Sequence, residues 1–71
     1  MEVTSQKVEK LLRGQHVFKL WAFSMLFTKL KNEYAADPTQ AKLEHCANEI
    51  NTFIAKYRNI MAPDLTIIQS I

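Results

Sequence analysis

The sequence predicts an all-α fold, an antiparallel helical hairpin followed by a short C-terminal helix or a docked tail. One glycine and two prolines among 71 residues leave few places for the tight turns of a β-sheet. Apolar residues recur at intervals of three and four over two long stretches, which is the helical period. The motif DPTQ at residues 37–40 is typical of a helix start and separates the two stretches.

The first predicted helix covers about residues 5–34, with Thr4 or Ser5 as its N-cap. Gly14 lies inside it and costs about 1 kcal/mol relative to alanine. This glycine therefore indicates a bend, a close approach of two backbones, or a tolerated solvent-facing position. One apolar stripe of the helix is expected to face its partner: Val8, Leu12, Leu20, Phe23, Leu26, Phe27, Leu30 and Tyr34.

The second predicted helix covers about residues 38–62. We expect Asp37 to accept from the free amides of the first turn and Pro38 to occupy the first helical position, where no amide is needed. Gln40 completes the capping box. The helix should end just before Pro63, which has no amide for the helical ladder. Its apolar stripe consists of Leu43, Cys46, Ala47, Ile50, Phe53, Ile54, Tyr57 and Met61.

The predicted tail, residues 63–71, carries four apolar side chains that a frayed chain end would expose to water. We therefore expect the tail to dock on the helices or on a partner. Residues 1–71 then form a single small helical domain, of a size at which one core supplies only about 3–5 kcal/mol and self-association helps. The docking side chains are Leu65, Ile67, Ile68 and Ile71.

The run VFKLWAFSMLF at residues 17–27 is apolar on nearly every side of a helix. At 100° per residue, four of its side chains face away from the stripe that packs on the second helix. This predicted aromatic patch consists of Val17, Phe18, Trp21 and Met25. Such residues are enriched in the cores of protein interfaces. The patch predicts a non-enzymatic interaction module, a small adaptor, regulator or inhibitor, that forms a homodimeric four-helix bundle or binds another protein.

The sequence predicts no catalytic, metal or cofactor site. His45 and Cys46 are neighbours, so a helix points them about 100° apart and spoils a nucleophile–base pair. His45 and Glu49 have the spacing of half a metal site, but the further ligands are missing. We expect Cys46 to be a core residue and His16 to be partly buried.

Charge is distributed unevenly, although the net charge is only +2. Residues 1–32 carry six basic and two acidic side chains, and residues 33–71 carry three and five. A basic face of Lys7, Lys10, Arg13 and Lys31 offers phosphate contacts, but so sparse a set indicates a solvated face more than a nucleic-acid site. Phe18, Trp21 and Met25 with flanking lysines resemble a membrane-surface pattern, which stays an alternative, but the apolar residues surround the helix rather than forming the single face that such a helix uses.

A cytoplasmic location is expected from three features. A single cysteine cannot form an internal disulfide bond. The charged amino terminus lacks the apolar core of a signal peptide. The apolar run at residues 17–27 is shorter than the roughly 20 residues that span a bilayer.

The segment DPTQAKLEHCANEINTFIAKYRN, about a third of the chain, resembles the second half of type III secretion needle subunits and their small helical co-chaperones. Those proteins also place a proline at the hairpin turn. The resemblance implies a small helical component of a secretion or assembly machine as an alternative function. The aromatic run at residues 17–27 does not match the first helix of a needle subunit.

Overall fold

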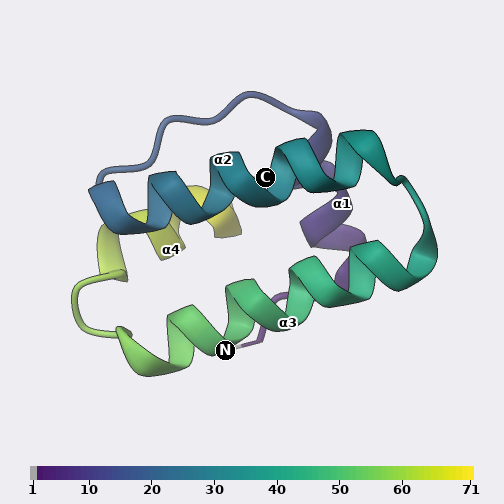
Figure 1. The fold of residues 1–71 in the computed structure, drawn as a ribbon. Helices are drawn as coiled ribbons and strands as arrows, with labels where there is room; N and C mark the ends of the chain where they lie inside the picture. Colours follow the sequence, from purple (N-terminus) through teal and green to yellow (C-terminus); the bar gives the residue numbers. More distant parts are fainter. Residues whose placement is uncertain (1) are drawn as a thin grey trace.

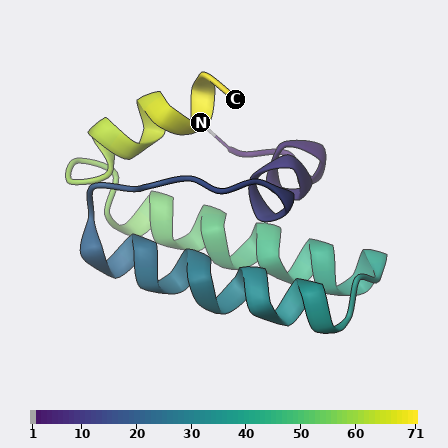
Figure 2. The same ribbon diagram turned by 90° about the horizontal axis from the view of Figure 1, so that it is seen from above.

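The computed structural model describes residues 2–71 and contains four α-helices and no strand in that range. The helices are α1 (Ser5–Arg13), α2 (Trp21–Ala36), α3 (Gln40–Lys56) and α4 (Ala62–Gln69). Helices α2 and α3 form an antiparallel hairpin (Figure 1), and α1 and α4 cover one face of it as a second layer (Figure 2). The all-α prediction is therefore confirmed. No helix among the described residues is long and apolar enough to cross a bilayer.

The predicted continuous helix over residues 5–34 is wrong, because an extended segment, residues 14–20, separates α1 from α2. This segment runs back along α2 to the start of that helix (Figure 2). Helix α1 ends at Gly14, whose amide donates to the carbonyls of Lys10 and Leu11, at 3.2 Å each. A Cβ atom at Gly14 would lie 2.6 Å from Nε2 of His16. The glycine thus permits a close approach of the His16 ring to the backbone.

Helix α2 begins where a side chain from α4 meets the backbone. Asp64 is fully buried, and its carboxylate accepts from the amides of Lys19 at 2.6 Å and Leu20 at 2.9 Å. Leu20 is the N-cap of α2 and supplies no capping side chain. The carboxylate also lies at the helix end that carries a partial positive charge. Asp64 therefore provides from a distance the cap that the local sequence lacks.

Helix α3 begins two residues later than predicted. Its N-cap is Thr39, whose hydroxyl accepts from the amide of Lys42 at 3.1 Å. Asp37 instead ends α2, where its amide donates to the carbonyl of Glu33 at 3.0 Å. Pro38 lies in the link between the helices rather than in the first turn. Both Asp37 and Thr39 are good N-caps by residue type, and the extended backbone at Thr39 decides between them.

Helix α3 also ends earlier than predicted, at Lys56 rather than near residue 62. Residues 57–61 form turns, and Pro63 lies in the first turn of α4, where a missing amide costs nothing. The C-terminal residues thus form a helix. Ile68 is buried in the core. Three partly buried apolar side chains of the C-terminal residues also pack against the core: Leu65, Ile67 and Ile71.

Two contacts attach the N-terminal part of the chain to the hairpin. The amide of Val3 donates to Oδ1 of Asn51 at 2.7 Å, and Nδ2 of Asn51 donates to the carbonyl of Val3 at 2.9 Å. The hydroxyl of Tyr34 donates to Oε2 of Glu9 at 3.0 Å, which raises the pKa of Tyr34. Helix α1 therefore packs against both α2 and α3 and covers the hydrophobic core between them.

We expect Asp64→Ala to lower the free energy of unfolding by about 3 kcal/mol, because hydrogen bonds to a charged acceptor contribute about 1.5–3 kcal/mol each. Urea denaturation followed by circular dichroism measures this change. The matched control is Asp37→Ala, at an exposed carboxylate, with an expected change below about 0.5 kcal/mol. Equal losses in the two variants would contradict the role given to Asp64.

Candidate interaction surface

The structure divides the predicted aromatic patch. Phe18 is buried, with 6 % of its surface exposed, and its ring packs edge to face on Phe23 at 4.9 Å and Phe27 at 5.0 Å. Its inclusion in the patch was wrong, because the extended backbone of residues 14–20 sends successive side chains to opposite sides. The other three members are exposed: Val17 (89 %), Trp21 (75 %) and Met25 (55 %).

A shallow groove lies between α2 and α3, near the end of the hairpin where α2 begins and α3 ends. Its lining consists of Leu26, Glu49, Thr52, Phe53, Lys56 and Tyr57. The ring of Phe53 lies 5.5 Å from that of Phe23 and 4.7 Å from that of Tyr57, so the groove is continuous with the core. The ammonium of Lys56 lies 5.4 Å from the centre of the Tyr57 ring. The groove is thus an aromatic surface with a cation at its edge.

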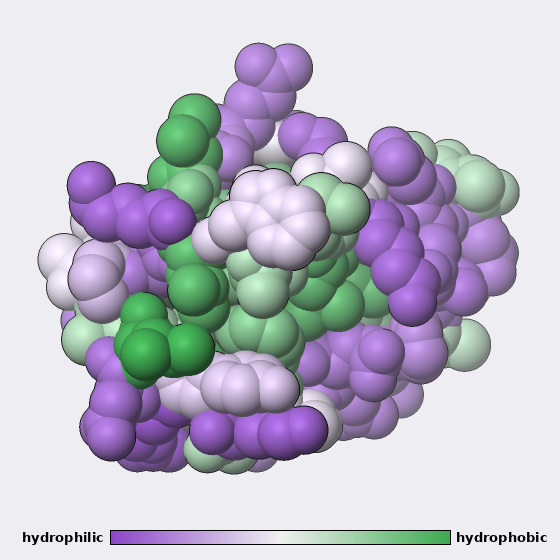
Figure 3. All heavy atoms as spheres, turned by 60° about the vertical axis from the view of Figure 1, so that its left-hand side comes forward, coloured by the Kyte–Doolittle hydropathy of each residue, from purple (hydrophilic) through white to green (hydrophobic). Residues whose placement is uncertain are grey.

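Four of the five exposed large apolar side chains in the described part of the chain lie at this end of the hairpin, and the fifth, Val17, lies on the extended segment that leads to it. We call Val17, Trp21, Met25, Tyr57 and Ile60 the apolar end. Tyr57 and Ile60, with 37 % and 55 % exposure, lie in the turns after α3. Figure 3 shows that hydrophobic and aromatic side chains occupy the middle of this face and hydrophilic ones surround them. An exposed cluster of this kind is a candidate interaction site.

The apolar end has a basic rim. Residues 17–29 and 50–62 contain no acidic residue, and their four cations are exposed: Lys19, Lys29, Lys56 and Arg58. The adjoining acidic residues do not cancel this charge fully, because Asp64 is buried on two amides and Glu49 is half-buried in the groove. Other acidic residues lie at the far end of the hairpin: Glu33, Asp37 and Glu44.

The predicted basic face is not a free row of cations. Lys7 donates to the carbonyl of Ile71 at 2.9 Å, and Lys31 donates to the carbonyl of Gly14. Lys7 therefore links α1 to the C-terminus, and Lys31 links α2 to the residue that follows α1. Lys10 and Arg13 are exposed in the last turn of α1.

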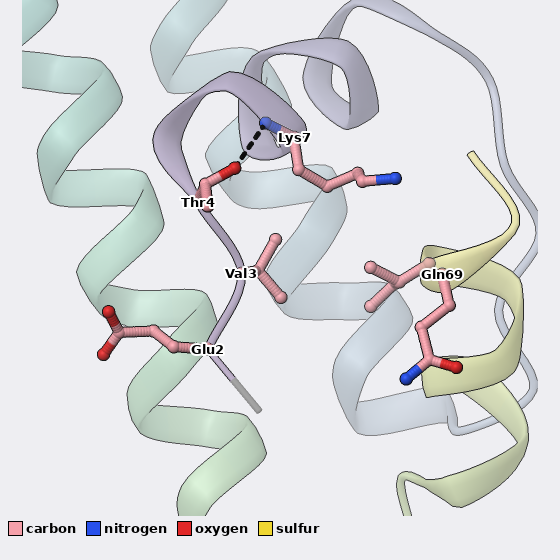
Figure 4. Close-up of a pocket in the computed structure, with 6 residues that line it drawn as sticks. Glu2, Val3, Thr4, Lys7 and Gln69 are labelled. Carbon is pink, nitrogen blue, oxygen red and sulfur yellow. Dashed lines mark hydrogen bonds between the residues drawn. The ribbon is translucent and has the colours of Figure 1, made fainter.

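A second hollow lies between the N-terminal segment and α4. It is lined by Glu2, Val3, Thr4, Lys7, Ile68 and Gln69 (Figure 4). The hydroxyl of Thr4 accepts from the amide of Lys7, and the ammonium of Lys7 is bound to the carbonyl of Ile71. Figure 4 shows the carboxylate of Glu2 directed away from the other side chains. The lining therefore lacks the convergent polar groups that orient a small ligand.

The candidate chemical groups are not brought together. Nε2 of His45 lies 3.8 Å from Oε1 of Glu33, rather than pairing with Glu49. Cys46 is buried, its Sγ lies 3.8 Å from the carbonyl oxygen of Leu30, and burial raises the pKa of its thiol. His16 lies beside two aromatic rings with its Nε2 buried and unpaired. No group of three or more metal-binding side chains occurs among residues 2–71.

Sequence reasoning missed Tyr57 and Ile60 as surface residues, because both were placed within a continuous second helix. The available signal was electrostatic: residues 50–62 carry Lys56 and Arg58 with no acid, as residues 17–29 carry two lysines with none. This shared sign of charge does not by itself place the two segments together, since like charges repel. The chain matches no protein-family model, no curated protein and no solved structure with which it was compared.

We expect the Cys46 thiol to react with an aromatic disulfide reagent at pH 8 at least about 100-fold more slowly in the folded chain than in denaturant, since burial blocks access and its raised pKa reduces the thiolate. Absorbance of the released thiolate follows the reaction. A Cys46→Ser chain gives the baseline. Equal rates with and without denaturant would show that the thiol is accessible.

Proposed function

We propose that this chain is a non-enzymatic protein-interaction module that associates through its apolar end with a second copy of itself. The observation that carries the proposal is Trp21, with 75 % of its surface in water at the start of α2 and Met25 one turn further along. Tryptophan is the residue type most typical of binding hot spots. Its exposure in so small a domain leaves a large apolar area for a partner to cover.

The arrangement of the helices supports a symmetric dimer. Helices α1 and α4 cover one face of the hairpin and leave the outer face free (Figure 2). Two copies can bring their α2–α3 pairs together as a homodimeric four-helix bundle that meets at the apolar end, because the other exposed residues of these helices are largely polar, as at Asn32, Glu44 and Asn48. A two-fold interface uses the same patch on both copies, and a protruding group beside a recess makes such a patch self-complementary. This chain provides Trp21 as the protruding group and the groove beside Leu26 and Phe53 as the recess.

The size of the apolar end indicates a weak dimer. Its five side chains expose about 500 Å² per copy, judged from the areas typical of such residues. Two copies would therefore bury about 1,000 Å², the lower bound for a specific interface. We expect a dissociation constant in the micromolar range, so that association responds to concentration.

The same surface suits an adaptor, regulator or inhibitor better than an enzyme. Catalysis requires converging reactive groups, but the candidate side chains point elsewhere. Cys46 is in the core, and His45 lies on the outer side of α3 beside Glu33. The exposed groups of the apolar end are aromatic, aliphatic and cationic, which are binding rather than reacting groups.

Light scattering on a dilution series from about 1 µM to about 200 µM tests self-association. We expect the mass to rise from one chain toward two, and Trp21→Ala to weaken dimerisation at least about tenfold with unchanged helicity. Phe18→Ala is the contrasting variant. Because Phe18 is buried, this change should lower the free energy of unfolding by about 3 kcal/mol, whereas Trp21→Ala should act mainly on the dissociation constant. A monomer at every concentration would refute self-association, as would an unaltered dimer in the Trp21 variant.

Salt should strengthen the dimer, because the two copies bring basic rims of the same sign together. We expect the dissociation constant to fall at least about twofold between about 50 mM and about 500 mM sodium chloride. Sedimentation velocity at fixed protein concentration measures the change. The double variant Lys56→Gln, Arg58→Gln should reduce the salt effect, and a dimer that dissociates in salt would contradict this interface.

A further inference from the structure

We propose that the apolar end also inserts into the surface of an anionic lipid bilayer. This use goes beyond self-association and does not rest on it, although both uses bury Trp21. The proposal depends on where the exposed apolar side chains lie, which charges surround them, and how rigidly the segments are held together.

Two of the exposed apolar side chains, Val17 and Ile60, lie outside the groove between α2 and α3. Val17, at 89 % exposure, belongs to the extended segment, and Ile60, at 55 %, belongs to the turns after α3. Neither lines the recess between α2 and α3. Together with Trp21 they are three exposed apolar side chains, or tips, on three separate segments: the extended segment, the start of α2 and the turns after α3. Separate tips suit the boundary between headgroups and acyl chains, where no matching recess is required.

The basic rim stands next to these tips. Lys19 lies between Val17 and Trp21 in the chain, and Lys56 and Arg58 immediately flank Tyr57. Long basic side chains can keep their charge among lipid phosphates while their stems follow the apolar surface. Tryptophan and tyrosine are also the aromatic residues that prefer this boundary. The composition of the rim and tips therefore fits an anionic lipid surface.

The charge distribution also orients the molecule. At the far end of the hairpin, about 20 Å from the start of α2 at the helical rise, Glu33, Asp37 and Glu44 are partly offset by Lys31 and Lys42, and Lys42 pairs with Glu33 at 3.4 Å. An anionic surface therefore attracts the basic rim more strongly than it attracts the far end of the hairpin. The long axis of the hairpin should therefore point the apolar end at the membrane.

Contacts with the core hold the segments that carry the exposed apolar side chains. The carboxylate of Asp64 binds the amides of Lys19 and Leu20, which joins the extended segment to the start of α4. Met61, just after Ile60, is fully buried and fixes the turns to the core. The segments that carry Val17, Trp21 and Ile60 are thus held in place by the fold before any lipid is met.

Trp21 is the only tryptophan in the chain, so its fluorescence reports insertion directly. The probes are phosphatidylcholine vesicles with and without about 30 % phosphatidylserine, mixed with protein dilute enough to be monomeric by light scattering. We expect a blue shift and co-sedimentation with the anionic vesicles, and at least tenfold weaker binding to the neutral ones. Salt should weaken this binding, which is the opposite of its effect on the dimer.

Variants separate the rim from overall charge. Lys56→Glu with Arg58→Glu should weaken vesicle binding at least about tenfold, since each cation near an anionic surface contributes about fivefold. The matched control, Lys10→Glu with Arg13→Glu, makes the same charge change on α1, and binding should stay within twofold. Ile60→Ser should also weaken binding while leaving the groove intact.

Three results would overturn the lipid proposal. The first is the absence of a blue shift with anionic vesicles, which would also be the outcome if the rim served an acidic protein. The second is equal binding to neutral and anionic vesicles. The third is an equal loss in the two charge-reversal variants, which would indicate attraction without a defined site. None of them affects the light-scattering result, so the dimer proposal stands or fails separately.

Discussion

The buried carboxylate of Asp64 is the interaction on which the arrangement of this chain depends. It accepts from two amides that precede α2, and it replaces the capping side chain that Leu20 cannot supply. A buried charge is costly unless hydrogen bonds compensate for its lost hydration. Its two acceptor bonds therefore only form when α4 lies against the start of α2, which couples the last helix to the break between the first two.

That break decides which aromatic side chain is hidden and which is exposed. In a continuous helix, Phe18 and Trp21 would lie near each other on one face. In the extended segment, Phe18 turns inward to pack on Phe23 and Phe27, while Trp21 starts a new helix with its ring in water. The core gains an edge-to-face aromatic cluster, and Trp21 stays exposed at the surface.

The sequence predicted the helical class and the contacts of the hairpin well, because Phe23, Phe27, Leu30 and Tyr34 repeat at the helical period over sixteen residues of α2. It marked the break only weakly, through Gly14 and the lack of a stripe residue between Leu12 and Leu20. The interactions that favour the extended form come from Asp64, more than forty residues away in the chain. Exposure at Tyr57 and Ile60 was missed for a related reason, since periodicity continued beyond Lys56.

The basic rim adds electrostatic repulsion between identical copies to the apolar attraction of the apolar end. An uncharged cluster of Trp21, Met25 and Ile60 would favour indiscriminate association, whereas same-sign charges around it oppose contact between identical copies. The same charges attract anionic surfaces, so they would weaken the proposed dimer and strengthen the proposed lipid binding. Ionic strength would move these two proposed associations in opposite directions, because one brings like charges together and the other brings unlike charges together. In both proposals the apolar side chains supply the attraction, and the four cations of the rim would determine which partner is favoured.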